Sequence, residues 1–118
     1  MDLKKYIRSI PDYPKKGILF RDITTLIKDE KAFAETIEQI VERSKKFNFG
    51  KIAAIESRGF VFASAVSYIL KKPFIMLRKK NKLPADVHSI DFELEYGTAT
   101  IEVHKDSIKK NDDVLIID

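Results

Sequence analysis

The chain has 118 residues, of which 44% are hydrophobic and 34% charged, with 4 Gly, 4 Pro and no Cys. These proportions exclude a disordered, a collagen-like or a disulfide-stabilised chain, and they predict one globular domain over residues 1–118. The lack of cysteine excludes thiolate zinc sites and a cysteine nucleophile. The net charge of +4 suggests anionic partners, although most lysines occur in scattered pairs typical of a solvated surface.

The sequence shows no pattern of a signal peptide or a membrane span. Residues 1–6 are polar and basic, and no apolar segment follows them. The most hydrophobic stretch, residues 60–70, is shorter than the ~18 residues that a membrane helix needs. We therefore expect a cytoplasmic protein that makes no membrane contact.

The N-terminal part is predicted to be mainly helical. Apolar spacing predicts a helix over residues 2–10 that Pro11 ends, followed by a turn-rich but structured connector to residue 23. A second, amphipathic helix begins after Asp29 as N-cap and ends at residues 48–50. Its apolar positions at helical spacing are Phe33, Ile37, Ile40 and Val41.

The remaining segments predict an α/β fold. Apolar strands at residues 52–55 and 73–77 flank a buried helix at 60–70, a pattern typical of a β-α-β unit with parallel strands. Residues 88–103 alternate on both sides of a turn, which predicts an antiparallel hairpin. Residues 114–117 form another buried strand, followed by Asp118.

The segment Glu56–Gly59 lies between a predicted strand and a buried helix. Ligands of open α/β sheets bind beyond the carboxyl ends of the strands, and a helix N-terminus offers free N–H groups to an anion. The planar guanidinium of Arg58 suits phosphate oxygens. The alternative, equally open on local grounds, is a tight turn in which Arg58 pairs with Glu56 or another acid.

A basic segment, residues 78–84, follows the second parallel strand. It is either a flap that closes over a pyrophosphate or nucleotide, or a solvated loop, with nucleic-acid contact as a weaker possibility. Glu93 and Glu95 lie on one face of the hairpin, where one carboxylate could handle a proton, although exposed glutamates are also ordinary there. His88 and His104 have no partner at metal-ligand spacing.

Residues 19–22, Leu-Phe-Arg-Asp, offer an aromatic face and polar groups to a flat base, or else form an ordinary strand with an Arg21–Asp22 surface pair. Taken together and in their order along the chain, this segment and those described above resemble the adenine phosphoribosyltransferases, a family of type I phosphoribosyltransferases. The resemblance covers essentially the whole chain. The segments that carry it are residues 7–14, 17–24, 56–60, 78–84, 94–97 and 104–106.

The resemblance implies transfer of the 5-phosphoribosyl group from phosphoribosyl pyrophosphate to N9 of adenine, giving AMP and pyrophosphate. It implies Mg²⁺ carried mainly by phosphoribosyl pyrophosphate, with no direct protein ligand, and a homodimer. The implied fold is a parallel sheet flanked by helices, with an antiparallel hairpin as a flap. The turn after the first parallel strand is implied to carry a cis non-proline peptide.

The resemblance also assigns residues. It assigns adenine to Leu19, Phe20 and Arg21, with Phe20 stacking on the ring and backbone groups reading its edge. It assigns catalysis to Glu95, which handles a proton near the base, and to Arg58, which holds pyrophosphate. Arg78 would reach the neighbouring subunit's site. The implied ligands of phosphoribosyl pyrophosphate or pyrophosphate are Ser57, Arg58, Arg78, Lys79, Lys82, Tyr96 and Asp118.

The sequence departs from the family pattern in three places. Lys16 stands where proline is common, and Asn81 stands where glycine is common, although Asn tolerates a positive φ. The family's strand with two acids is represented by residues 114–117 and only the first acid, Asp118, with no 5-phosphate loop after it. We therefore expect a fold that is incomplete at its C-terminal side, and a 118-residue chain that does not bind phosphoribosyl pyrophosphate normally.

Two other functions stay open. One is a regulator that keeps this fold, senses nucleotide and binds nucleic acid, as the pI near 9.2 would allow. No DNA-reading element precedes Pro11, so nucleic acid is the less favoured partner. The other is a phosphoribosyltransferase for a different purine, such as xanthine.

Overall fold

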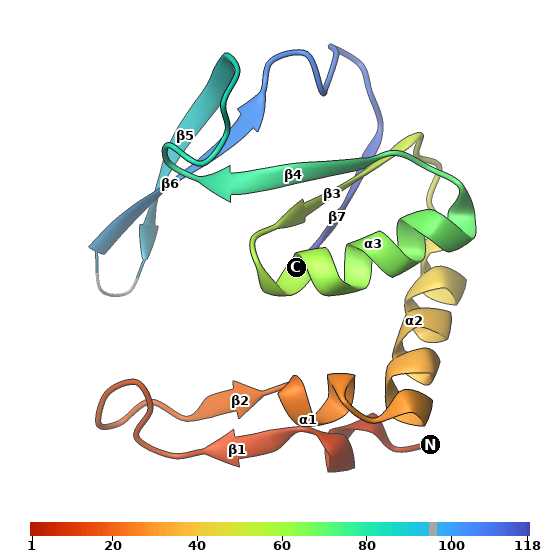
Figure 1. Ribbon diagram of the computed structural model, residues 1–118, viewed down its shortest axis with the longest axis vertical. Helices are drawn as coiled ribbons and strands as arrows, with labels where there is room; N and C mark the ends of the chain where they lie inside the picture. Colours follow the sequence, from red (N-terminus) through yellow and green to blue (C-terminus); the bar gives the residue numbers. More distant parts are fainter. Residues whose placement is uncertain (95–96) are drawn as a thin grey trace. The chain divides into compact units, whose positions relative to one another are not determined.

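The computed structural model describes residues 1–94 and 97–118. It divides into two compact units, Met1–Ser44 and Lys45–Asp118, which are described separately. The single domain expected from the sequence stays a prediction. No helix within the described residues is both long enough and apolar enough to cross a membrane. Figure 1 labels the elements along the chain.

The first unit contains a small hairpin and two helices. A 3-10 helix, η1 (Leu3–Tyr6), leads into β1 (Arg8–Ile10), which pairs antiparallel with β2 (Phe20–Asp22). The predicted helix over residues 2–10 is therefore wrong in its second half. An isolated helix of that length is marginal, and the residue before Pro11 is biased toward an extended backbone, so strand pairing prevails.

Two helices follow the hairpin, α1 (Thr24–Ile27) and α2 (Glu30–Ser44). The Asp29 carboxylate accepts hydrogen bonds from the N–H groups of Lys31 and Ala32, so the predicted N-cap is confirmed. The helix ends at Ser44, several residues before the predicted stop. Ala32 and Ile37 are buried on its apolar face.

The second unit is built on one mixed sheet with the strand order β5-β6-β4-β3-β7. The strand β3 (Lys51–Ile55) pairs parallel with β4 (Phe74–Lys79) and with β7 (Val114–Ile117). Between β3 and β4, α3 (Arg58–Leu70) packs against the three parallel strands, as Figure 1 shows. The predicted β-α-β unit is confirmed. The fully buried residues at its centre are Ile52, Ala54, Ala63 and Val66.

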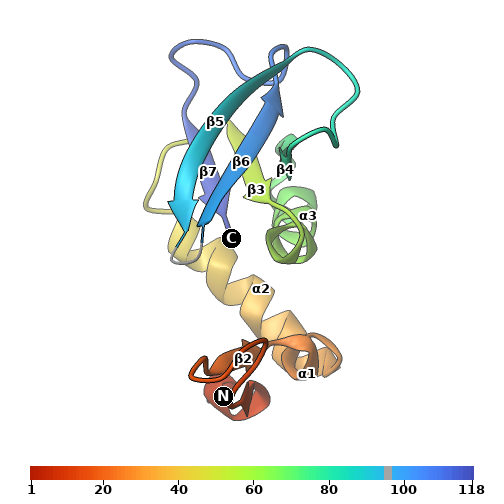
Figure 2. The same ribbon diagram turned by 90° about the vertical axis from the view of Figure 1, so that its left-hand side faces the viewer.

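The other two strands of the sheet, β5 (Val87–Leu94) and β6 (Gly97–His104), form the predicted hairpin, and their pairing is visible in Figure 2. Opposed residues share a face, so one face carries apolar pairs such as Ile90–Ile101 and Phe92–Ala99. The other face carries polar pairs, among them Ser89–Glu102 and Asp91–Thr100. β6 also pairs antiparallel with the end of β4, where Arg78 lies opposite Glu102.

Candidate active site

The carboxyl ends of the three parallel strands carry the polar residues expected from the sequence. Ser57 and Arg58 follow β3, Lys79 ends β4, and Asp118 follows β7. Because β3 pairs in parallel with both of its neighbours, these residues lie at the same edge of the sheet. The expected cis non-proline peptide is confirmed between Glu56 and Ser57.

The start of α3 lies directly against the end of β7. The Arg58 guanidinium contacts the Asp118 carboxylate at 3.4 Å, and both side chains are more than half exposed, at 58% and 54%. Gly59 permits this approach, because a Cβ atom there would lie 2.6 Å from the carbonyl oxygen of Ile117. Arg58 therefore pairs with an acid, as one of the two alternatives predicted, and this acid is Asp118. Both side chains remain accessible to solvent.

Glu56 joins the turn after β3 to the end of β4. Its carboxylate accepts a hydrogen bond from the backbone N–H of Lys79, and its Oε2 lies 3.5 Å from Nη2 of Arg78. The Lys79 N–H and the Arg78 charge lower the pKa of Glu56 despite its desolvation. The buried Nε of Arg78 has no hydrogen-bond partner among the described residues. Glu56 therefore contacts both a backbone group and a side chain at the end of β4.

A basic turn follows β4. We call residues 79–82 the basic turn, since three of its four side chains are lysines, all of them exposed. The N–H of Lys82 donates to the carbonyl of Lys79 at 3.3 Å, and Asn81 has a φ of 67°. Asn81 thus takes the left-handed conformation that glycine would adopt easily, so the turn survives the substitution.

The base-binding segment predicted from the sequence lies on β2 in the first unit. Successive strand residues face opposite sides, so Phe20 and Arg21 point in opposite directions. The Phe20 ring packs edge-on against Tyr13, with centroids 5.2 Å apart, and remains 38% exposed. Leu19, just before β2, is also half exposed.

The Arg21 side chain lines a different surface from that of Phe20. Its Nη1 donates to the Ser9 hydroxyl at 2.5 Å. Both residues border a hollow of about 430 Å³, whose other lining residues are Lys4, Ile7 and Ile23. The three predicted adenine residues are therefore consecutive, but a flat ligand on Phe20 would meet only the backbone of Arg21.

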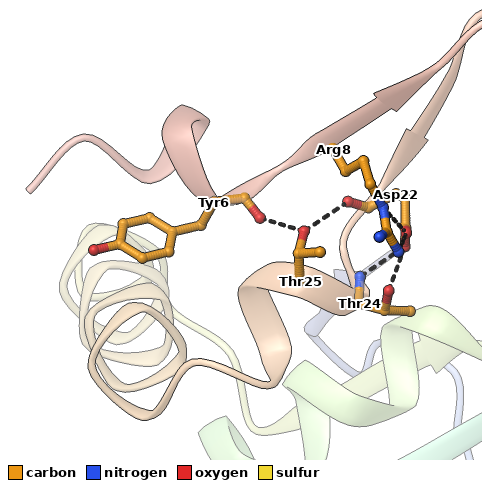
Figure 3. Close-up of polar contacts among 5 residues, drawn as sticks. All are labelled: Tyr6, Arg8, Asp22, Thr24 and Thr25. Atoms are coloured by element: carbon orange, nitrogen blue, oxygen red, sulfur yellow. Dashed lines mark hydrogen bonds and ion pairs between the residues drawn. The ribbon is translucent and has the colours of Figure 1, made fainter.

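Asp22, which one of the two predicted alternatives placed at the surface, is only 7% exposed and connects the two strands of the first unit's hairpin. Its Oδ2 accepts from Nε and Nη2 of Arg8, at 3.0 and 2.5 Å, and its Oδ1 accepts from the N–H and hydroxyl of Thr24 (Figure 3). The Thr24 hydrogen bonds, followed by those of Arg8, lower the pKa of Asp22 to about 2. The Arg21–Asp22 surface pair, one of the two alternatives for this segment, is therefore wrong, because the partner of Asp22 is Arg8.

Other predicted site residues are placed less fully. Glu95 and Tyr96 lie outside the described residues. In residues 1–94 and 97–118, no three Asp, Glu, His or Cys side chains gather closely enough to hold a metal ion.

Glu102 was not predicted from the sequence to belong to the site. It is a charged residue between two apolar ones on a strand, and this pattern is the signal that could have revealed it.

Comparison with known proteins identifies the family. The phosphoribosyl transferase domain family matches residues 23–118. The adenine phosphoribosyltransferase of Pelagibacter ubique is 82% identical over 118 residues, which are 100% of this chain and 67% of the relative. This chain belongs to the adenine phosphoribosyltransferase family. The domain match begins at residue 23, directly after the segment predicted to hold the base.

Solved structures of adenine phosphoribosyltransferases agree with this membership. The Thermoanaerobacter pseudethanolicus enzyme is 46% identical, with a TM-score of 0.93 over 98% of this chain and 67% of its own. The Saccharomyces cerevisiae enzyme, complexed with adenine and an imino-altritol bisphosphate, is 30% identical, with a TM-score of 0.89 over 99% and 69%. The fold class inferred from the sequence, a phosphoribosyltransferase-like sheet with a hairpin, is confirmed.

Proposed function

We propose that the protein acts in purine salvage, transferring the 5-phosphoribosyl group of phosphoribosyl pyrophosphate to N9 of adenine. The products are AMP and pyrophosphate. The observation that carries this proposal is a set of exposed cationic groups at one edge of the sheet, where Arg58 follows β3 and Lys79 ends the adjacent parallel strand β4, in a chain of this family. Nothing in the fold favours a nucleic-acid-binding regulator or an enzyme for another purine.

The polyphosphate end of the substrate is assigned to the edge of the second unit. The bond from the ribose C1′ to pyrophosphate breaks with its electron pair leaving on pyrophosphate, so negative charge grows on the leaving group. The guanidinium of Arg58 and the ammonium of Lys79 stabilise that charge. Lys82 and the turn at Ser57 supply further contacts to the pyrophosphate. Exposure of these groups leaves them available to a ligand.

The base is assigned to the β2 segment. Phe20 remains 38% exposed, so its ring can stack on adenine, and the backbone of Leu19 and Arg21 can read the edge of the base. Glu95 is proposed to take the N9 proton as the bond from N9 to C1′ forms, and Tyr96 to contact phosphoribosyl pyrophosphate. The Saccharomyces cerevisiae relative, crystallised with adenine, supports the choice of base.

Magnesium fits this donor set as a companion of the substrate. The ion would be carried mainly by the phosphates of phosphoribosyl pyrophosphate with no direct protein ligand, and the Asp118 carboxylate, 54% exposed at the end of β7, would contact the substrate itself. When bound, the ion would neutralise part of the pyrophosphate charge. The homodimer, the reach of Arg78 into the partner's site and the cytoplasmic location also remain proposals.

The test is a base-competition assay on the natural gene product that carries this sequence. With phosphoribosyl pyrophosphate and Mg²⁺, we expect pyrophosphate release with adenine and very little with hypoxanthine, guanine or xanthine. A salt-titrated DNA-binding assay runs beside it, and we expect only weak binding that disappears with added salt. A preference for xanthine, or salt-resistant sequence-specific DNA binding without AMP formation, would replace the proposal with the corresponding alternative.

A further inference from the structure

We propose that Glu102 is a positioning residue that fixes the basic turn, residues 79–82, in the geometry that binds a polyphosphate. The inference deepens the proposed function and rests on it for the identity of the ligand. The structural half of the inference, that one buried carboxylate sets the conformation of this turn, stands on the contacts of Glu102 alone.

Glu102 occupies the centre of the three-stranded part of the sheet. It lies on β6, opposite Arg78 of β4 on one side and opposite Ser89 of β5 on the other. The residue is 7% exposed, one of few charged side chains in the described structure with so little solvent contact. Burial of a carboxylate is unfavourable unless the group is hydrogen-bonded, so its partners indicate its role.

Both oxygens of the carboxylate have partners, and one partner belongs to the basic turn. Oε1 accepts the backbone N–H of Asn81 at 2.8 Å, and Oε2 accepts the hydroxyl of Ser89. Asn81 is the residue with the left-handed φ of 67°, so the hydrogen bond acts on the least favourable backbone conformation of the turn. The Ser89 hydroxyl orients the carboxylate from the opposite strand.

A second carboxylate holds the other end of the same turn. Glu56 accepts the N–H of Lys79, and Glu102 accepts the N–H of Asn81 two residues later. Two backbone donors of the turn are thus occupied by protein carboxylates, and the Lys82 N–H donates to the carbonyl of Lys79. The basic turn therefore meets an anionic ligand chiefly through the exposed ammonium groups of its lysines.

The charge of Glu102 also suits this role. Three exposed lysines in four residues repel one another, and a buried anion beneath the turn offsets that repulsion. The Ser89 hydroxyl, the Asn81 N–H and the Lys80 charge together lower the pKa of Glu102 against its desolvation, so the group is ionised at neutral pH. The lysines can then stay close together before any ligand binds.

A neighbouring pair on the same face of the hairpin supplies the matched control. The Thr100 hydroxyl donates to Asp91 Oδ1 at 2.6 Å across the same two strands, next to the Ser89–Glu102 pair. Asp91 is exposed and bonds only within the hairpin in the described contacts. Loss of Asp91 therefore removes a cross-strand carboxylate–hydroxyl bond without touching the basic turn.

The experiment compares Glu102→Ala, Glu102→Gln, Ser89→Ala and Asp91→Ala in the natural gene product. We expect Glu102→Ala to raise the KM for phosphoribosyl pyrophosphate about tenfold, with the KM for adenine changed by less than about twofold. Glu102→Gln keeps an acceptor for the Asn81 N–H and should restore most of the affinity. Ser89→Ala should lie between wild type and Glu102→Ala, and Asp91→Ala should match wild type.

Amide hydrogen exchange at Asn81 gives a readout that does not depend on catalysis. Faster exchange is expected in Glu102→Ala, but not in Asp91→Ala, even if the wild type made no AMP. Failure of the proposed function can therefore be distinguished from failure of the inference about Glu102. An unchanged KM for phosphoribosyl pyrophosphate in Glu102→Ala would overturn the proposal, as would equal effects in Asp91→Ala. If Glu102→Ala does not fold, Ser89→Ala and Glu102→Gln test the proposal by the same two measurements, the KM for phosphoribosyl pyrophosphate and amide exchange at Asn81.

Discussion

Arg8 and Asp22 face each other across the first hairpin, and the guanidinium donates two hydrogen bonds, of 3.0 and 2.5 Å, to a single carboxylate oxygen. The other oxygen binds the first residue of α1, Thr24. The Thr25 hydroxyl of α1 donates to the carbonyl of Tyr6 at the end of η1, which attaches α1 to the start of the chain as well (Figure 3). One carboxylate thus connects β1, β2 and α1, two residues along the strand from Phe20.

The contribution of Asp22 to stability depends on pH. Its folded pKa of about 2 lies below 3.8, the ordinary pKa of an aspartate in an unfolded chain, so the stabilisation is complete above about pH 4 and is lost as pH falls toward 2. Asp22→Asn should therefore lower the Tm at pH 6, and the difference from wild type should shrink between pH 4 and 2. Thermal unfolding followed by circular dichroism at pH 6, 4, 3 and 2.5 measures it.

Asp2→Asn serves as the control for this experiment, because it changes an exposed carboxylate in the same unit. Its Tm should follow that of wild type at every pH. A gap between wild type and Asp22→Asn that stays constant from pH 6 to 2.5 would show that the ionised form of Asp22 contributes nothing.

The Phe20 ring should determine affinity for adenine. Stacking of a base on an aromatic side chain contributes about 1–3 kcal/mol, so Phe20→Ala should raise the KM for adenine by about ten- to a hundredfold. The KM for phosphoribosyl pyrophosphate should change far less. Phe47→Ala, which removes a ring that is also substantially exposed, at 55%, should leave both constants alone. Parallel rises in both constants in Phe20→Ala would point to general damage.

Arg58 should not be replaceable by lysine. The bidentate guanidinium fits a pyrophosphate in a way that a single ammonium cannot, so Arg58→Lys should lower kcat/KM for phosphoribosyl pyrophosphate about tenfold or more. The Tm should hardly change, since the exposed Arg58–Asp118 contact contributes little to stability. Arg43→Lys on α2 provides the same substitution away from the site. Full activity in Arg58→Lys would assign the residue a purely structural role.

Gly59 should resist even the smallest side chain. The added methyl group of Gly59→Ala would lie 2.6 Å from a backbone oxygen of Ile117, and such overpacking costs about 1–3 kcal/mol of unfolding free energy. Gly50 is the matched control, because a Cβ there meets nothing within 4 Å. Urea unfolding should separate the two variants clearly, and equal stability of both would contradict the close packing of α3 on β7.

The sequence predicted the second unit better than the first. Continuous apolar runs around a helix predicted the two parallel strands, alternation predicted the hairpin, and the structure confirms both. At residues 8–10 the apolar spacing fits a helix as well as a strand, and the pairing with β2 decides between them. That pairing depends on a residue 14 positions away, Asp22, which no local pattern reveals.

The residues of the candidate site could be predicted from the sequence, but the hydrogen bonds between them could not. Arg58, Lys79 and Asp118 were expected at strand ends, and the parallel register puts them on one edge. The partners of the carboxylates were not expected, because Glu56 and Glu102 bind backbone N–H groups of a turn that is distant in sequence. Such contacts follow from sheet order, which sequence patterns do not specify.

The opposite orientation of Phe20 and Arg21 has a consequence for how this hairpin can evolve. A slip of one residue in the β1–β2 register would turn the aromatic side chain away and bring a cation to the surface it occupied. The Arg8–Asp22 pair opposes such a slip, since it exists in one alignment alone. Insertions and deletions should therefore be selected against within the two strands, and tolerated only in the connecting loop away from Tyr13 and Leu19.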